Sequence, residues 1–132
     1  MLPSSTRRIL VVDDDPDLAE VLDRVLEKSG YVVTWAKNGQ EALRCLRDKE
    51  RLDVVLLDLM MPVMNGWEFR AEQLKDPTLS RIPVVVFSGH GKLDQNAVSI
   101  GAVANLRKPI GLHELLTVLE QIFDRRPGAV GQ

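Results

Sequence analysis

Four aspartates follow an apolar run near the start of the chain, in the stretch VVDDDPD at residues 11–17. Like charges at contact distance repel by roughly 1 kcal/mol per pair even in water, so such crowding needs a cation, a helix terminus, or both. Asp15 precedes a proline and is typical of a helix N-cap, and the helix dipole favours Asp17 in the first turn. Asp13 and Asp14 remain as candidates for binding a cation.

Three further polar side chains stand at the ends of other apolar runs. Asp58 follows VVLL, Ser88 follows VVVF, and Lys108 stands just before Pro109. Aspartates from two strand ends that face one crevice make a site for Mg²⁺, which prefers oxygen ligands and often bridges carboxylates to a phosphate. We expect the Asp58 carboxylate to attack phosphorus and form an aspartyl phosphate, with Lys108 and Ser88 stabilising the transferred group.

The hydrophobic pattern predicts the elements that position these residues. Short apolar runs predict strands, and apolar residues at helical spacing predict helices. Strands are expected at 8–12, 31–36, 52–60, 82–89 and 103–107, and helices at 16–29, 42–46, 67–75, 92–100 and 112–123, with an Asn38-Gly39 turn before the second helix. The alternation predicts an α/β fold with a parallel sheet, helices on both faces and a site at the carboxyl ends of the strands.

Composition limits the classes of function. A chain of 132 residues with net charge −2, 45% hydrophobic and 27% charged residues is typical of one globular domain. Its sequence has no basic stripe, zinc-type spacing, membrane-length apolar run or signal-peptide core, so we expect no direct contact with nucleic acid or membrane. The single Cys45 excludes an intramolecular disulfide and fits a cytoplasmic location.

Four motifs together resemble the receiver domain of bacterial two-component response regulators: ILVVDDDPD, VVLLDLMMPVMNG, PVVVFSG and the Lys108-Pro109 pair. The motifs occur in the order of that family, over a core of about residues 8–123, and we expect a flexible tail at 124–132. The resemblance implies a (βα)5 doubly wound parallel sheet with the flavodoxin-like strand order 2-1-3-4-5, and a cis peptide bond before Pro109.

The resemblance also implies a metal site. Asp13 and Asp14 would hold Mg²⁺, Asp14 directly and Asp13 more often through water. The Asp58 carboxylate and the backbone carbonyl of Met60 would complete the protein ligands.

By the same resemblance, Asp58 takes a phosphoryl group from the phosphohistidine of a histidine kinase or phosphotransfer protein. Ser88 and Lys108 would contact that group. The responding face would be helix 4, strand 5 and helix 5, about residues 92–123, which would bind a downstream protein or a second copy after phosphorylation. Asn105, in GAVANLRKP, stands where receivers usually carry Tyr or Phe, so the usual aromatic switch is absent.

Several alternatives remain. The chain is expected to be a stand-alone regulatory receiver, not an enzyme in the ordinary sense, but it could equally be excised from a larger hybrid protein. A phosphatase with an aspartyl-phosphate intermediate would need a second aspartate where Met60 stands, and a flavin module would have its phosphate repelled by DDDPD. Trp35 and Trp67 are interpreted as packing residues and His113 as exposed.

Overall fold

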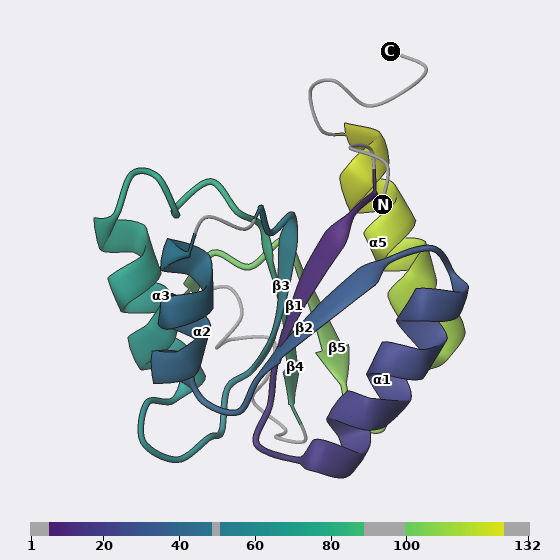
Figure 1. Cartoon of the computed structure of the whole chain (residues 1–132), viewed down its shortest axis with the longest axis horizontal. Coiled ribbons are helices and arrows are strands. Elements are labelled where there is room, and N and C mark those ends of the chain that lie inside the picture. Colours follow the sequence, from purple (N-terminus) through teal and green to yellow (C-terminus); the bar gives the residue numbers. More distant parts are fainter. Residues whose placement is uncertain (1–5, 49–50, 89–99, 126–132) are drawn as a thin grey trace.

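The computed structural model describes residues 6–48, 51–88 and 100–125 (Figure 1). Its elements, in chain order, are β1 (Arg8–Val12), α1 (Pro16–Lys28), β2 (Val32–Ala36), α2 (Gly39–Arg47), β3 (Val54–Asp58), α3 (Gly66–Lys75), β4 (Val84–Ser88), β5 (Ala104–Arg107) and α5 (Leu112–Arg125). The helix expected at 92–100 lies almost wholly outside the described residues.

The five strands form one parallel sheet in the order β2-β1-β3-β4-β5, which confirms the predicted fold. Figure 1 shows α2 and α3 on one face of the sheet and α1 and α5 on the other. Both faces are therefore covered, which explains why the central strands read as continuous apolar runs rather than as alternating ones.

Successive residues of each central strand enter different cores. Leu10 and Val12 of β1 pack in the cluster under α2 and α3, whereas Ile9 and Val11 pack in the cluster under α1 and α5. All four side chains are fully buried. Since side chains alternate across a strand, burying both sets fixes the register and hence the position of each strand's last residue.

Local capping sets where the helices begin. The Asp15 side chain accepts hydrogen bonds from the N–H groups of Asp17 (3.0 Å) and Leu18 (3.4 Å), which confirms it as the N-cap of α1. Asn38 also caps a helix, because its side chain accepts from the Glu41 N–H at 2.9 Å. The prediction of a separate Asn38-Gly39 turn was therefore wrong, since these residues open α2.

Two further expectations need correction. Val21 and Leu112 belong to the apolar spacing that predicts helices at 16–29 and 112–123, and such residues are expected to be buried, but they are 49% and 39% exposed. Both line a pocket of about 290 Å³ between α1 and the start of α5. The helix α5 also continues to Arg125, two residues past the expected end of the core.

Within the described ranges, no helix has the length and apolar character needed to span a membrane.

Candidate functional site

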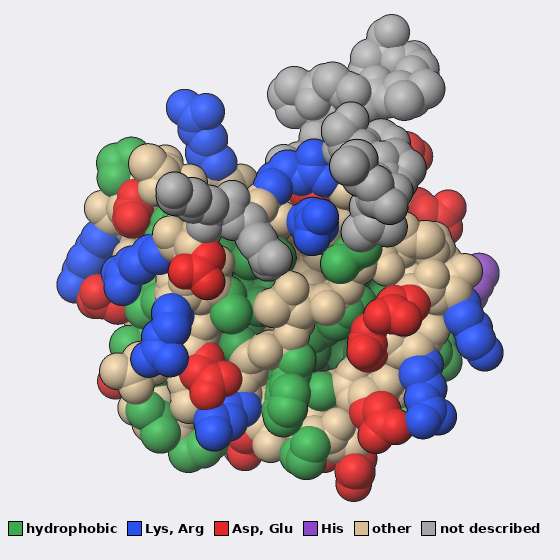
Figure 2. Space-filling model, in the orientation of Figure 1, with side chains coloured by type: hydrophobic (Ala, Val, Ile, Leu, Met, Phe, Trp, Pro, Cys, Tyr) green, Lys and Arg blue, Asp and Glu red, His purple; other side chains and the backbone are tan. Residues whose placement is uncertain are grey.

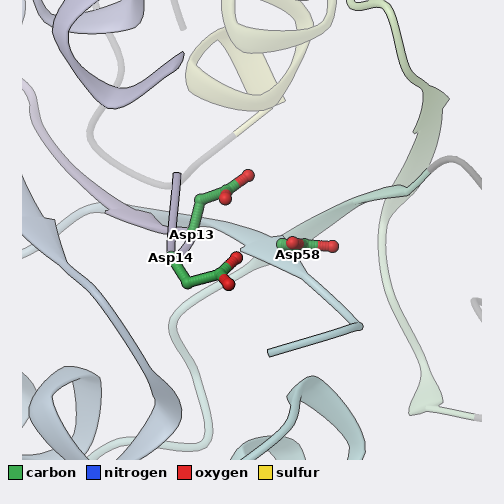
Figure 3. Close-up of side chains that lie close together, drawn as sticks. All are labelled: Asp13, Asp14 and Asp58. Carbon is green, nitrogen blue, oxygen red and sulfur yellow. The ribbon is translucent and has the colours of Figure 1, made fainter. Parts of the chain in front are cut away.

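The register of the sheet brings the ends of β1 and β3 together. Val12 pairs with Leu57, so the residues that follow them, Asp13 and Asp58, lie side by side at the carboxyl edge. Asp13 is fully buried and Asp58 is 3% exposed, whereas Asp14 is exposed. Carboxylate oxygens of these three residues all lie within 4.8 Å of one another (Figure 3). The predicted convergence of aspartates from two strand ends is therefore found.

Asp13 is held by the chain on every side. Its N–H donates to the carbonyl of Ala36 at 3.1 Å, which continues the pairing of β1 with β2. Its Oδ1 accepts from the Asp15 N–H at 2.8 Å, and its Oδ2 accepts from Lys108 Nζ at 2.9 Å. A buried carboxylate costs little when its oxygens are satisfied in this way.

Asp58 shares the same lysine. Lys108 Nζ donates to Asp58 Oδ2 at 3.3 Å, and the Met60 N–H donates to Asp58 Oδ1 at 3.2 Å. The Lys108 side chain is 29% exposed, and its Nζ also lies 5.3 Å from the centre of the Phe87 ring. Its peptide bond to Pro109 is cis, as the resemblance implied.

The surroundings of Asp58 and Lys108 affect the charged forms of these two residues in opposite ways. Burial, and then the charge of Asp13, raise the pKa of Asp58, while Lys108 and the Met60 N–H partly oppose that rise. Burial lowers the pKa of Lys108, but its hydrogen bond to Asp13 and the charges of Asp58 and Asp13 outweigh burial and raise it overall. The ammonium form of Lys108 is therefore stabilised, whereas the ionised form of Asp58 is destabilised.

The donor set suits a hard divalent cation. Three carboxylates cluster near one ammonium, which leaves an excess of negative charge at a partly buried site. Oxygen ligands of this type are those that Mg²⁺ takes in proteins. The structure thus satisfies the donor chemistry expected for Asp13, Asp14 and Asp58, while the described contact of Met60 is through its N–H.

Two predicted residues are located only by their backbone or strand position. Ser88 is the last residue of β4 and pairs with Arg107 of β5, one residue before Lys108, but its side chain lies outside the described part. Asn105 lies on β5, where it pairs with Val86 of β4, and it is partly buried. The strand positions of both residues agree with the sequence interpretation, and their roles stay predictions.

One contact at this site was missed. Trp35, interpreted as a packing residue, is 43% exposed, and its indole N–H donates to the backbone carbonyl of Asp13 at 2.7 Å. Its position in the sequence could have indicated this contact. Trp35 stands one residue before the end of β2, which pairs with β1, so it lies near the first acidic residues after β1. Trp67 packs against the α2–α3 core, and His113 is exposed, as expected.

The sequence is similar to those of known proteins. PilH of Pseudomonas aeruginosa is 35% identical over 121 residues, covering 88% of this chain and 97% of that protein. A CpxR homolog of Haemophilus influenzae, a transcriptional regulatory protein, is 38% identical over 120 residues, covering 89% of this chain and 51% of that protein. The chain spans about half the length of several of the curated relatives it matches.

A solved structure of the response regulator TrrA from Thermotoga maritima, in complex with Mg²⁺-BeF, has the same fold. It is 29% identical with a TM-score of 0.79, over 89% of this chain and 99% of that one. A family model described as the response regulator receiver domain matches residues 9–120, nearly the whole chain. The chain therefore belongs to the response regulator receiver domain family.

Proposed function

We propose that this chain is a phosphoacceptor switch in which Asp58 receives a phosphoryl group with the help of Mg²⁺. The observation that carries the proposal is the meeting of Asp58 with Asp13 and Lys108 at the carboxyl edge of the sheet. A nucleophilic carboxylate, further carboxylates for a cation and a fixed ammonium are the groups that phosphoryl transfer to an aspartate requires.

The residues have distinct tasks in this mechanism. The Met60 N–H orients one oxygen of Asp58, which leaves the carboxylate in a fixed direction for attack. An oxygen–phosphorus bond to Asp58 forms while the phosphorus–nitrogen bond of the donor phosphohistidine breaks, and the released imidazole takes a proton. Asp13, Asp14 and Asp58 would hold Mg²⁺, which would supply positive charge to the phosphoryl oxygens. Lys108 supplies a second positive charge, and Ser88 is assigned a hydrogen bond to a remaining oxygen.

The proposed partners follow from the family. The donor is a histidine kinase or phosphotransfer protein. The recipient of the signal is a downstream protein or a second copy that contacts the face at about residues 92–123, which includes β5 and α5. The chain is one domain at residues 1–132, with a core at about residues 8–123, that works in the cytoplasm and catalyses only its own phosphorylation and dephosphorylation. The TrrA complex with Mg²⁺-BeF, in a protein of the same fold, supports Mg²⁺ as the cation.

The test is phosphorylation by a small donor. Wild-type protein, Asp58→Ala and Asp53→Asn are incubated with acetyl phosphate, with and without Mg²⁺, and their intact masses are recorded. Asp53 is the matched control because it is also a buried aspartate, at 2% exposure, but accepts from the Arg8 N–H away from the cluster. We expect one Mg²⁺-dependent phosphoryl adduct on wild type and on Asp53→Asn, and none on Asp58→Ala.

Either of two results would overturn the proposal. An adduct that persists in Asp58→Ala would place the acceptor elsewhere. No adduct on wild type, with acetyl phosphate or with a phosphorylated histidine donor that modifies a control receiver, would remove the phosphoacceptor function. Steady turnover of small phosphoesters would favour the phosphatase alternative instead.

A further inference from the structure

The indole N–H of Trp35 makes a hydrogen bond within the protein, although this half-exposed side chain could bond to water instead. Trp35 is 43% exposed and lines a groove of about 410 Å³ between α1 and β2. Figure 2 shows this face of the molecule, with acidic side chains over α1. The indole N–H nevertheless donates to the Asp13 carbonyl at 2.7 Å, which is short for an N–H···O bond. The ring is therefore held by a polar contact as well as by packing.

That hydrogen bond extends the sheet by one step. The backbone pairing of β1 with β2 ends at Val12 and Ala36, and the Asp13 N–H still reaches the Ala36 carbonyl. The next backbone acceptor along β1 is the Asp13 carbonyl. It accepts a hydrogen bond from the Trp35 indole N–H rather than from a backbone N–H. Both backbone polar groups of Asp13 are thus fixed by β2.

The position of that carbonyl matters for the cluster. It belongs to the peptide group that joins Asp13 to Asp14, and a peptide group is planar. Fixing its oxygen therefore also fixes the direction in which the chain enters Asp14. The Asp13 carboxylate has its own contacts to Asp15 and Lys108, whereas Asp14 is exposed and is carried into the cluster by this backbone.

We propose that Trp35 is a positioning residue for the acidic cluster, whose indole N–H orients the Asp13–Asp14 peptide and thereby sets the affinity of the cluster for Mg²⁺. This inference rests on the proposed function, because it assumes that the cluster binds Mg²⁺. Groups that orient metal ligands without touching the metal typically change its affinity by about 10- to 100-fold when removed. Trp35 acts through a backbone carbonyl, so we expect a loss of about three- to tenfold, below that range.

The decisive experiment is calorimetric titration of Mg²⁺ into the full chain carrying Trp35→Phe or Trp67→Phe. Trp67 is the matched control because it is a partly buried tryptophan packed against the α2–α3 core. We expect Trp35→Phe to weaken Mg²⁺ binding by about three- to tenfold and Trp67→Phe to leave it within about twofold, even if its melting temperature falls. Equal Mg²⁺ affinity in Trp35→Phe and wild type would overturn the inference.

Two additions separate the N–H from the ring and from folding. Benzothienylalanine at position 35 keeps the bulk of the indole but lacks the donor, so it should weaken Mg²⁺ binding as Trp35→Phe does; wild-type affinity would overturn the role of the N–H. In wild type, the indole N–H nuclear magnetic resonance signal of Trp35 should shift on Mg²⁺ addition while that of Trp67 stays, and Asp14→Asn should abolish the shift.

The outcomes distinguish the two proposals. A wild-type protein that binds Mg²⁺ but takes no phosphoryl group overturns only the proposed function. A wild-type protein that is phosphorylated, with Mg²⁺ affinity independent of Trp35, overturns only the positioning role. A wild-type protein that binds no Mg²⁺ at all overturns both.

Discussion

Lys108 Nζ lies 2.9 Å from Asp13 Oδ2, although the two residues are 95 positions apart in the sequence. Asp13 is fully buried, and the Lys108 side chain is 29% exposed, so the ion pair is only partly screened by water. The same ammonium also reaches Asp58. In the described structure, Lys108 is thus the counterion that makes two adjacent buried carboxylates tolerable.

Lys108→Met should therefore destabilise the protein and strengthen its binding of Mg²⁺. Without the ammonium, Asp13 and Asp58 repel each other and lose hydrogen bonds, at a cost of about 1–3 kcal/mol in the absence of divalent cations. Mg²⁺ no longer competes with an internal cation, so it should bind more tightly and recover much of the loss. Urea denaturation with and without Mg²⁺ measures both effects.

Lys75→Met is the control for Lys108→Met. Lys75 is bonded to Glu72 at 2.7 Å, but its side chain is 71% exposed, and such pairs contribute about 0–1 kcal/mol. We expect little change in stability and none in the Mg²⁺ response. If Lys108→Met matched Lys75→Met in both measurements, Lys108 would not be the counterion of the cluster.

Asp58→Asn should stabilise the protein at neutral pH, and the gain should shrink on acidification. Burial and the charge of Asp13 raise the pKa of Asp58 above its usual 3.8, so the folded chain binds this proton more tightly than the unfolded chain. Asp58 therefore adds to the free energy of unfolding at pH values below its pKa in the unfolded chain. This contribution is lost as pH rises through its pKa in the folded chain. Asparagine does not titrate, so the variant avoids that loss.

Urea denaturation of Asp58→Asn and wild type across about pH 4 to 7 checks this sign. Asp53→Asn provides the contrast, because Asp53 accepts from the Arg8 N–H at 2.8 Å and lies 3.4 Å from Arg51 Nε. Removing that paired carboxylate should destabilise the protein at neutral pH. A gain for Asp58→Asn that did not vary with pH would argue against a raised pKa as its source.

The acidic cluster could be predicted from the sequence because strand ends in a parallel sheet share one edge. Once Asp13, Asp58 and Lys108 are assigned to the ends of their strands, topology alone brings them together. The sequence did not reveal which oxygen of Asp13 accepts from which donor. It also did not reveal the Trp35 contact, since the rotamer of a half-exposed indole depends on the local path of the chain after the ladder ends.

The burial of two polar residues of α3 could not be predicted from the sequence either. Arg70 and Gln73 are 8% and 0% exposed, yet nothing in the apolar spacing of this helix marks them as internal. They bond to each other and to backbone carbonyls of the segments at 79–82 and 100–101. Periodicity describes which face is apolar, whereas satisfaction of a buried polar group depends on distant backbone.

Val63→Gly should stabilise the protein by about 0.5–1.5 kcal/mol. Val63 has a φ of 69° and is 76% exposed, so a β-branched residue is held in the left-handed region with little packing in return. Glycine removes that strain, and the gain should exceed the added freedom of the unfolded chain. Chemical denaturation measures the difference.

Val103→Gly is the control for Val63→Gly. Val103 is also an exposed valine in a loop, at 57%, but has no positive φ. Glycine there should destabilise the protein by about 0.4–1 kcal/mol through the unfolded state. Opposite signs at the two sites would support strain at Val63, whereas losses of equal size at both would exclude it.

Arg70→Met should cost about 2–4 kcal/mol of stability. The guanidinium donates to the Ile100 carbonyl at 2.8 Å, to the Gly101 carbonyl at 3.4 Å and to Gln73 Oε1 at 2.8 Å. Burial lowers its pKa, but these acceptors satisfy its planar fork. Methionine fills the space of the side chain and leaves buried acceptors without this donor.

Two variants separate the fork of Arg70 from its charge. Arg70→Lys keeps the charge but has one nitrogen in place of the three that donate here, so it should recover less than half of the loss measured by urea denaturation. Arg24→Met removes an exposed arginine, 75% accessible and paired with Glu20 on α1, and should cost at most about 0.5 kcal/mol. Full recovery by lysine would mean that charge, rather than the set of carbonyl contacts, holds α3 to the segment at 100–101.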